Sequence, residues 1–137
     1  DAVDRLFTGT LEAQAHPYFR ALAGAELSTH FFISRDGRLT QYVSCLDRAW
    51  HAGRSSYRGV AECNDYAVGI ELEGSESCAF CPPQYAVLTN LVSALQKAYP
   101  EIKNRVAAHS EVAPGRKHDP GPHFSWQWLP ERASSEL

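Results

Sequence analysis

Alternating hydrophobic and polar positions in the middle of the chain predict β-strands. Residues 28–34 hold a β-branched and aromatic run, and an Asp-Gly pair then predicts a hairpin turn into a second strand over residues 39–43. In residues 66–73, aliphatic side chains alternate with polar ones, which indicates a half-buried strand. Because the side-chain period of a strand is two, Glu71 and Glu73 point to one face, opposite the aliphatic residues.

Helical spacing is clearest in the second half of the chain. Residues 83–99 carry aliphatic side chains three and four positions apart between prolines, which predicts a helix. A shorter helix is expected over residues 17–27, and Ser125 is expected to cap a brief helix near the C-terminus. Residues 105–109 are predicted to form a short strand that ends at His109.

The alternation of strands and helices predicts the architecture. It favours an α/β fold with a central mixed β-sheet flanked by helices. Residues 50–65 are rich in Gly, Ser, Arg and Tyr without a period, so we expect a long loop, and such loops often carry function. A chain of 137 residues with 44% hydrophobic content can bury one ordinary core, so a single domain over residues 1–137 is expected.

Charge and hydropathy exclude two classes of partner. The formal net charge is -3, and neither a basic tract nor a basic helix face is present, which argues against nucleic acid and anionic membranes. No apolar run approaches the roughly 20 residues that cross a bilayer. We therefore expect a soluble protein with no nucleic-acid and no membrane partner.

The four cysteines are Cys45, Cys63, Cys78 and Cys81. The last two have the spacing of half a zinc knuckle, but no second close Cys or His pair lies at a suitable distance. We interpret the cysteines as structural thiols, with a redox role or a second metal site as the alternative. At this length a core forms without disulfides, so a reducing compartment fits at least as well as an oxidising one.

The strongest candidate chemistry lies near the C-terminus. His109, Lys117 and Asp119 fall within one short, proline-stiffened stretch. Catalytic zinc takes three protein ligands and keeps a position open for water, and His109 and Asp119 could supply two of the three. On the residues alone, His109 could equally be a polar loop residue, Lys117 a solvated charge, and Glu71 an exposed strand carboxylate equivalent to Glu73.

Short motifs in order along nearly the whole chain resemble those of the AmpD family. They are LFTGT (6–10), AHP (15–17), QYV (41–43), RAWHAG (48–53), CND (63–65), GIELEG (69–74) and KHDPGP (117–122). This family comprises bacterial cytosolic N-acetylmuramyl-L-alanine amidases of cell-wall recycling, related in fold to T7 lysozyme and the peptidoglycan recognition proteins. The resemblance implies the same amidase fold for this chain.

The resemblance also implies an activity. It indicates a zinc hydrolase that cuts the amide between the lactyl group of 1,6-anhydro-N-acetylmuramic acid and L-alanine in peptidoglycan fragments. By position, His109 and Asp119 match two zinc ligands, Glu71 the catalytic carboxylate and Lys117 the catalytic lysine. Glu71 would move the proton and Lys117 would neutralise the oxyanion. Substrate contacts are expected at Tyr18, Trp50, His51, Asn64, Ala113 and Arg116.

Location and partners follow from the same resemblance. It implies a cytoplasmic bacterial protein that acts as a monomer on an anhydromuropeptide substrate. The family's first zinc ligand is a His on a strand before the region that corresponds to Leu6, and we expect that segment to be missing here. The third ligand would then come from a lost N-terminal piece, from a complementing N-terminal fragment, or from His30 or His51. Packing roles, in the core for His30 and in the groove wall for His51, are the simpler interpretation of these two.

An alternative function is a binding module. Peptidoglycan recognition proteins keep this fold and its groove while losing a zinc ligand, and they bind wall fragments without cutting them. The joint presence of Glu71, Lys117, His109 and Asp119 favours the enzyme, because a binding module has no need of all four. The expected absence of the first ligand favours the binding module or a truncated enzyme.

Overall fold

The computed structural model describes residues 28–74 and 79–132. The helix expected over residues 17–27 lies outside these ranges. The elements in chain order are the strands and helices β1 (Phe31–Ile33), β2 (Leu39–Gln41), β3 (Ser56–Tyr57), β4 (Val60–Ala61), η2 (Cys63–Asp65), β5 (Ile70–Leu72), α3 (Pro82–Ala98), η3 (Pro100–Ile102), α4 (His109–Val112) and η4 (Trp126–Trp128), where η marks a 3-10 helix.

A three-stranded sheet with β1 at its centre organises the fold. Its order is β2-β1-β5, and β1 pairs antiparallel with β2 and parallel with β5. The predicted hairpin and the predicted strand before Gly74 both form, although each strand is only three residues long. The sheet is mixed and packs against helices, so the predicted α/β class is confirmed.

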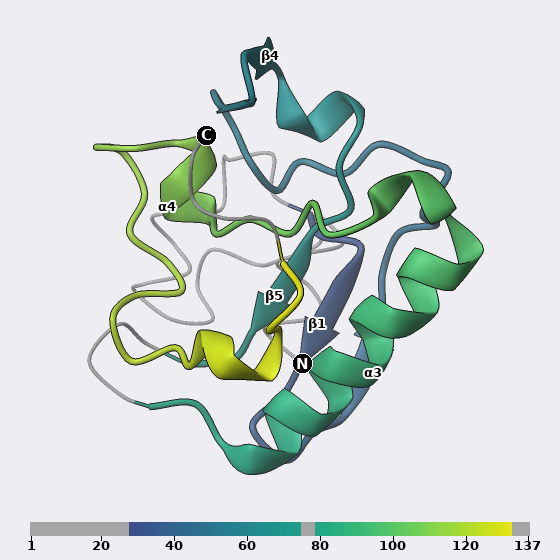
Figure 1. The fold of residues 1–137 in the computed structure, drawn as a ribbon, viewed down its shortest axis with the longest axis vertical. Coiled ribbons are helices and arrows are strands. Elements are labelled where there is room, and N and C mark those ends of the chain that lie inside the picture. Colours follow the sequence, from purple (N-terminus) through teal and green to yellow (C-terminus); the bar gives the residue numbers. More distant parts are fainter. Residues whose placement is uncertain (1–27, 75–78, 133–137) are drawn as a thin grey trace, which may run out of the picture.

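Helix α3 covers one face of this sheet. Phe31 and Ile33 of β1 belong to one buried cluster with the apolar side of the helix, and Ile70 and Leu72 pack against the same cluster. Because side chains alternate along a strand, Glu71 faces the other way. Figure 1 shows α3 along one side of the β1–β5 pair and α4 on the other. Helix α3 contributes to this cluster the side chains of Tyr85, Leu88, Leu91, Val92 and Leu95.

The strand predicted over residues 105–109 is wrong. Helix α4 begins at His109, and the residues before it are not in a strand. The carboxylate of Glu111 accepts the backbone N–H of Ala108 at 2.7 Å, and Ala108 in turn accepts the N–H of Glu111 through its carbonyl at 3.0 Å. These local bonds begin a helix and satisfy backbone groups that a sheet partner would otherwise have to satisfy. Arg132 holds Glu111 in place through an ion pair at 2.7 Å.

The long loop expected over residues 50–65 contains regular structure. β3 and β4 form an antiparallel hairpin, and η2 follows directly. The turn residues Arg58 and Gly59 have φ angles of 50° and 83°, the left-handed region that two-residue hairpin turns require. Strands of two residues are too short to leave a period in the sequence, which is why this hairpin was not predicted.

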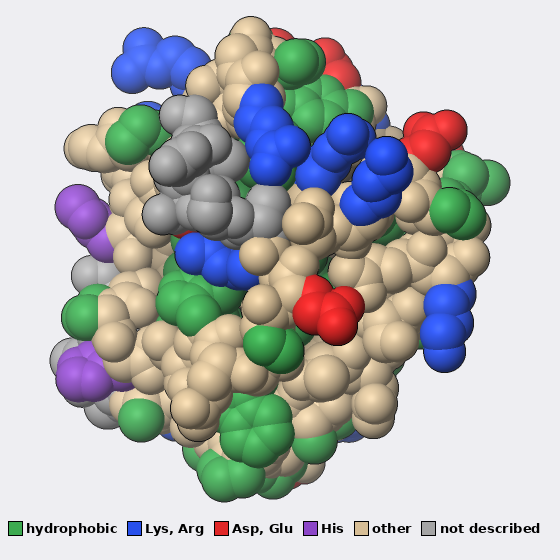
Figure 2. Space-filling view, viewed as in Figure 1, with side chains coloured by type: hydrophobic (Ala, Val, Ile, Leu, Met, Phe, Trp, Pro, Cys, Tyr) green, Lys and Arg blue, Asp and Glu red, His purple; other side chains and the backbone are tan. Residues whose placement is uncertain are grey.

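Helix η4 forms where a brief C-terminal helix was predicted, and Ser125 occupies the N-cap position, but its side chain makes no capping hydrogen bond. In the described ranges no helix is both long enough and apolar enough to cross a membrane. On the face shown in Figure 2, Lys and Arg side chains lie mostly over the upper part and hydrophobic side chains toward the lower edge.

Gln84 ties the start of α3 to the sheet. Its side chain is fully buried, with 0% exposure. The amide nitrogen donates to the carbonyls of Ile33 at 3.3 Å and Glu73 at 2.9 Å, and the amide oxygen accepts the N–H of Cys81 at 2.9 Å. One side chain therefore connects the ends of β1 and β5 with the N-terminus of the helix.

We predict that Gln84→Ala lowers the free energy of unfolding by about 2 kcal/mol, because buried backbone groups lose their partners. Chemical denaturation followed by circular dichroism measures this loss. The matched control is Gln96→Ala on the same helix, whose amide donates to the Lys103 carbonyl at 2.6 Å in an exposed position where water can replace it. Equal losses in the two variants would contradict the role assigned to Gln84.

Candidate active site

One large cavity brings together three of the four predicted catalytic and metal-binding residues. Its volume is about 1070 Å³, and Glu71, His109 and Asp119 all contribute to its lining. His51 and Ala52 line it as well. The predicted catalytic carboxylate and the two predicted zinc ligands therefore share one cavity.

Helix α4 and the turn after it bring His109 and Asp119 together. His109 is the first residue of α4, and the N–H of Ser110 donates to the backbone carbonyl of Asp119 at 3.0 Å. The side chains meet with 3.1 Å between His109 Nδ1 and Asp119 Oδ2. Lys117 lies on the turn between them, where its N–H donates to the Ala113 carbonyl at 3.0 Å, and its side chain is exposed.

Burial and the charges of Asp119, His109 and Lys117 shift the pKa of Glu71. Burial raises the pKa of Glu71 from 4.5, and the negative charge of Asp119 adds to the rise, while His109 and Lys117 oppose it. The resulting pKa is about 7. A carboxyl group with this pKa can both accept and return a proton near neutral pH, as general acid–base catalysis requires.

Glu73 has a different environment, although it is two residues from Glu71 and on the same side of the chain. Its side chain is exposed, and one carboxylate oxygen accepts the backbone N–H of Arg35 at 2.9 Å. The structure therefore distinguishes two carboxylates that the residue pattern alone made equivalent.

Each member of the His109–Asp119 pair shifts the pKa of the other. Burial lowers the pKa of His109, but hydrogen bonds with Asp119 and the Ala52 carbonyl and the charge of Asp119 outweigh it, so the pKa is raised. Burial raises the pKa of Asp119, but the hydrogen bond and charge of His109 outweigh it, so the pKa is lowered. Both shifts favour the charged forms of the pair.

His109 and Asp119 fit two positions of a zinc site by ligand type and separation. Two ligands about 2.1 Å from a tetrahedral ion lie roughly 3.4 Å from each other, close to the 3.1 Å between Nδ1 and Oδ2. Within residues 28–74 and 79–132, no group of three His, Cys, Asp or Glu side chains is arranged to hold a metal ion. The described residues thus offer two candidate ligands, and their roles, like the third ligand, stay a prediction.

The two imidazoles considered as substitute ligands are engaged elsewhere. His30 is 1% exposed, its Nε2 donates to the Asp47 carbonyl at 2.8 Å, and its Nδ1 accepts the N–H of Gly69 at 3.0 Å. Both ring nitrogens are used, so His30 is a core imidazole. Nε2 of His51 donates to the Ala67 carbonyl at 3.1 Å, and the ring packs edge-on against His30.

Gly69 lies against the His51 ring with no room for a side chain. A Cβ atom at Gly69 would lie 2.5 Å from Cγ of His51. The Gly69 carbonyl accepts the N–H of Phe31 at 3.1 Å and the hydroxyl of Thr29 at 3.0 Å. These contacts fix the chain directly before β5 and so fix the position of Glu71.

The residues expected to contact the substrate differ from one another in exposure. Trp50 is 45% exposed, and Arg116 is exposed with its guanidinium turned to backbone carbonyls. Ala113 and Asn64 are buried, with 5% and 4% exposure. Tyr18 lies outside the described residues. Contact with substrate stays a prediction for each of them.

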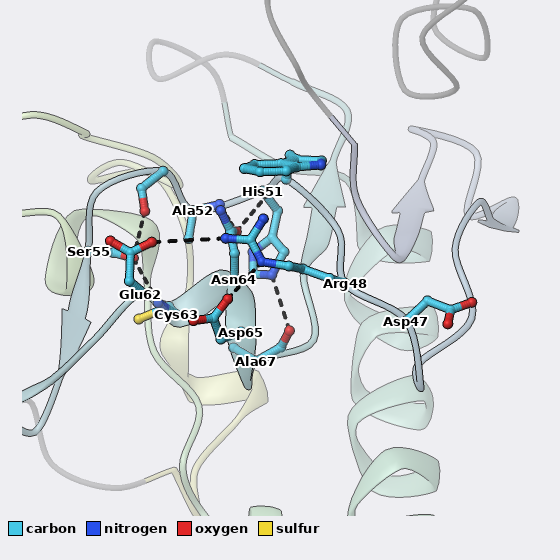
Figure 3. A network of polar contacts seen from close by, with 12 residues as sticks. Asp47, Arg48, His51, Ala52, Ser55, Glu62, Cys63, Asn64, Asp65 and Ala67 are labelled. Atoms are coloured by element: carbon cyan, nitrogen blue, oxygen red, sulfur yellow. Dashed lines mark hydrogen bonds and ion pairs between the residues drawn. The ribbon is translucent and has the colours of Figure 1, made fainter.

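Arg48 links the RAWHAG segment (48–53) to η2. No sequence pattern predicted this link. Its Nε donates to Asp65 Oδ1 at 2.7 Å, and its NH2 lies 3.9 Å from Glu62 Oε2 (Figure 3). The guanidinium carbon lies 4.0 Å from the centre of the Trp50 ring. The signal in the sequence was the RAWHAG motif, in which Arg48 had no assigned role.

Comparison with known proteins gives the family. A family model described as N-acetylmuramoyl-L-alanine amidase matches residues 2–122. The chain belongs to this family. The resemblance to the AmpD group is confirmed, because AmpD of Citrobacter freundii, a 1,6-anhydro-N-acetylmuramyl-L-alanine amidase, is 49% identical over 124 residues, covering 90% of this chain and 66% of that protein. The AmpD of Escherichia coli (strain K12) is 48% identical, covering 90% of this chain and 68% of that protein.

Solved structures agree with this family assignment. A crystal structure of an Se-Met AmpD derivative superposes with a TM-score of 0.91 at 47% identity, covering 94% of this chain and 72% of that one. The amidase AmiD from E. coli, solved with anhydro-N-acetylmuramic acid-L-Ala-D-gamma-Glu-L-Lys, gives a TM-score of 0.73 at 33% identity, covering 83% of this chain and 51% of that one. The chain spans about two thirds of the length of the AmpD proteins it matches.

We predict that His51 makes the stability of this amidase domain depend on pH. Burial lowers the pKa of His51 from 6.5 to about 4, helped by the charges of His30, His109 and Arg48, against the Ala67 hydrogen bond. The imidazole of the unfolded chain binds a proton more readily than that of the folded protein. Neutral His51 therefore contributes fully to the free energy of unfolding above pH 6.5, and this contribution, up to about 3 kcal/mol, is lost as pH falls toward 4.

Denaturant unfolding of the wild type and His51→Gln at pH 7, 5.5 and 4 measures this contribution. The wild type should lose more stability than His51→Gln over this range. The control is His123→Gln, which removes an exposed imidazole and should keep the wild-type pH dependence. Parallel curves for the wild type and His51→Gln would refute the assignment.

Proposed function

We propose that this chain hydrolyses the amide between the lactyl group of N-acetylmuramic acid, in its 1,6-anhydro form, and L-alanine in peptidoglycan fragments. Membership of the amidase family and the similarity to AmpD proteins over 90% of the chain support this activity. So does the likeness to AmiD, whose structure holds an anhydromuropeptide. The activity belongs to cell-wall recycling, and we assign it to a monomer in the bacterial cytoplasm.

The observation that carries the proposal is that Glu71 lines one cavity with His109 and Asp119. The raised pKa of Glu71, about 7, suits a group that accepts the proton of the attacking water and delivers it to the leaving nitrogen. In the net reaction a C–O bond forms between water and the carbonyl carbon, the C–N bond breaks, and the proton ends on the amine of L-alanine. Glu71 returns to its starting state.

His109 and Asp119 would hold zinc together with a third ligand outside the described residues. Zinc, when bound, supplies positive charge that acidifies the attacking water and polarises the amide carbonyl. Lys117 places a further positive charge close enough to Glu71 and Asp119 to affect the pKa of each. We assign Lys117 the stabilisation of negative charge on the carbonyl oxygen as the amide is attacked.

The remaining site residues would bind the substrate. Trp50 offers an exposed aromatic surface, suited to the apolar face of a sugar ring. Arg116 is exposed, and although one guanidinium nitrogen binds the Ala52 and Arg54 carbonyls, its other nitrogens suit a carboxylate of the stem peptide. Tyr18, His51 and Ala113 complete the proposed contacts. Asn64 was expected among them, but its side-chain oxygen accepts the backbone N–H groups of His51 and Ala52.

We predict that Glu71→Gln reduces kcat by about 100-fold to 10,000-fold while KM changes little, because the amide keeps the shape but cannot carry the proton. Release of the stem peptide from an anhydromuropeptide, followed by chromatography, measures both constants. The matched control is Glu73→Gln, two residues away on an exposed side chain, which should keep near-wild-type activity. Equal losses in both variants would place the effect in the strand and refute the catalytic role.

We predict that the purified protein retains about one zinc per chain after dialysis against metal-free buffer, and that Asp119→Ala retains much less. Elemental analysis gives the ratio, and the control His123→Ala should match the wild type. A wild-type protein that binds anhydromuropeptide but holds no zinc and cuts nothing would support the alternative function, a non-catalytic binding module, and contradict the amidase.

A further inference from the structure

Asn64 is buried beside the cavity, and its side chain is turned to the protein backbone. Only 4% of the residue is exposed. Its Oδ1 accepts two successive backbone N–H groups, that of His51 at 3.0 Å and that of Ala52 at 2.8 Å. One carboxamide oxygen therefore holds two neighbouring peptide units (Figure 3). This arrangement does not require Asn64 to touch the substrate.

The carbonyl of Ala52 is the next link, and it reaches the predicted zinc ligand. It accepts Nε2 of His109 at 3.0 Å and the guanidinium NH2 of Arg116 at 2.6 Å. Ala52 is itself 4% exposed, so its position depends on these bonds and on Asn64. The chain of contacts thus runs from Asn64 through Ala52 to His109.

Hydrogen bonds on both sides of Asn64 hold helix η2 in place. Asn64 is the middle residue of η2, and the N–H of Cys63 donates to the Ser55 hydroxyl at 3.2 Å. On the other side of Asn64, Asp65 Oδ1 forms an ion pair with Nε of Arg48 at 2.7 Å. These bonds hold the helix that presents Asn64 against the segment that contains Ala52.

The contact with Ala52 fixes the orientation of the His109 ring, so that Nδ1 faces Asp119. The two ring nitrogens of His109 lie against two different acceptors: Nε2 is 3.0 Å from the Ala52 carbonyl oxygen, and Nδ1 is 3.1 Å from Asp119 Oδ2. Histidines that bind metal commonly donate their other ring N–H to a carbonyl, which fixes the ring and its tautomer. Nδ1, which faces Asp119, is therefore the ring nitrogen that would bind the ion after losing its proton.

We propose that Asn64 is a positioning residue, which holds the Ala52 carbonyl so that His109 presents Nδ1 beside Asp119. This inference rests on the proposed function, since it concerns the histidine expected to bind zinc. It assigns Asn64 a role through His109, in place of the substrate contact expected from the sequence.

The test reads the His109 ring directly in the metal-free protein. At a pH where the ring is charged, proton–nitrogen NMR follows both ring N–H groups and measures how fast each proton exchanges with water. The wild type and Asn64→Asp, which keeps the acceptor oxygen, should show a slowly exchanging proton on Nε2, held by the Ala52 carbonyl. Asn64→Ala should exchange this proton faster, while the proton on Nδ1, held by Asp119, keeps its rate.

Zinc affinity, measured by competition with a chelator, is the second readout. Asn64→Ala should bind zinc about 10-fold to 100-fold more weakly than the wild type, as expected when the partner of a metal-binding histidine is lost. The control is Gln84→Ala, which also removes a buried side-chain amide, but one whose partners are the Ile33 and Glu73 carbonyls. It should leave both the exchange rate and the affinity unchanged.

Each result decides between roles. A wild-type exchange rate of the Nε2 proton in Asn64→Ala, or the same losses in Gln84→Ala, would overturn the proposal and leave Asn64 a purely structural residue. If Asn64→Ala does not fold, a folded Asn64→Asp with fast exchange at Nε2 would also overturn it, and one with slow exchange would support it. A wild type that binds no zinc would count against the proposed function, while the exchange rates still test Asn64.

Discussion

The parallel pairing of β5 with β1 is the constraint on which the rest of the structure depends. It sets Ile70 and Leu72 against the core that α3 covers, and the two-residue period of the strand then turns Glu71 to the opposite side. That side faces the cavity that His109 and Asp119 also line. There, burial and the negative charge of Asp119 raise the pKa of Glu71.

The cavity is closed by segments that are far apart in the sequence and joined mainly through backbone groups. His30 and Asn64 each use a buried polar side chain to bind the backbone of a neighbouring segment. Arg116 connects the C-terminal turn to residues 52 and 54 in the same way. Buried polar groups that are fully hydrogen-bonded rigidify a site, so the loops around Glu71 and His109 can hold a defined shape without long strands.

Sequence patterns predicted the elements whose signal is periodic. Helix α3 was placed correctly because many residues repeat at one spacing, and β5 forms over Ile70–Leu72 within the longer strand predicted for residues 66–73. Helix α4 and the β3–β4 hairpin are too short for a repeat to show. The grouping of His109 with Asp119 followed from motif spacing and family resemblance, and the separation of Glu71 from Glu73 by burial required the structure. The contacts of Asn64 could not be predicted, because its partners are backbone N–H groups, which almost every residue has.

The tight contact between Gly69 and His51 has a consequence for how this protein can change. The imidazole acts as a spacer whose thickness sets the distance between the RAWHAG segment and the start of β5. A methyl group at position 69 could be accommodated only if position 51 became smaller at the same time. The two positions are therefore coupled, and the residue pair at 51 and 69 adjusts where Glu71 stands in the cavity without touching Glu71 itself.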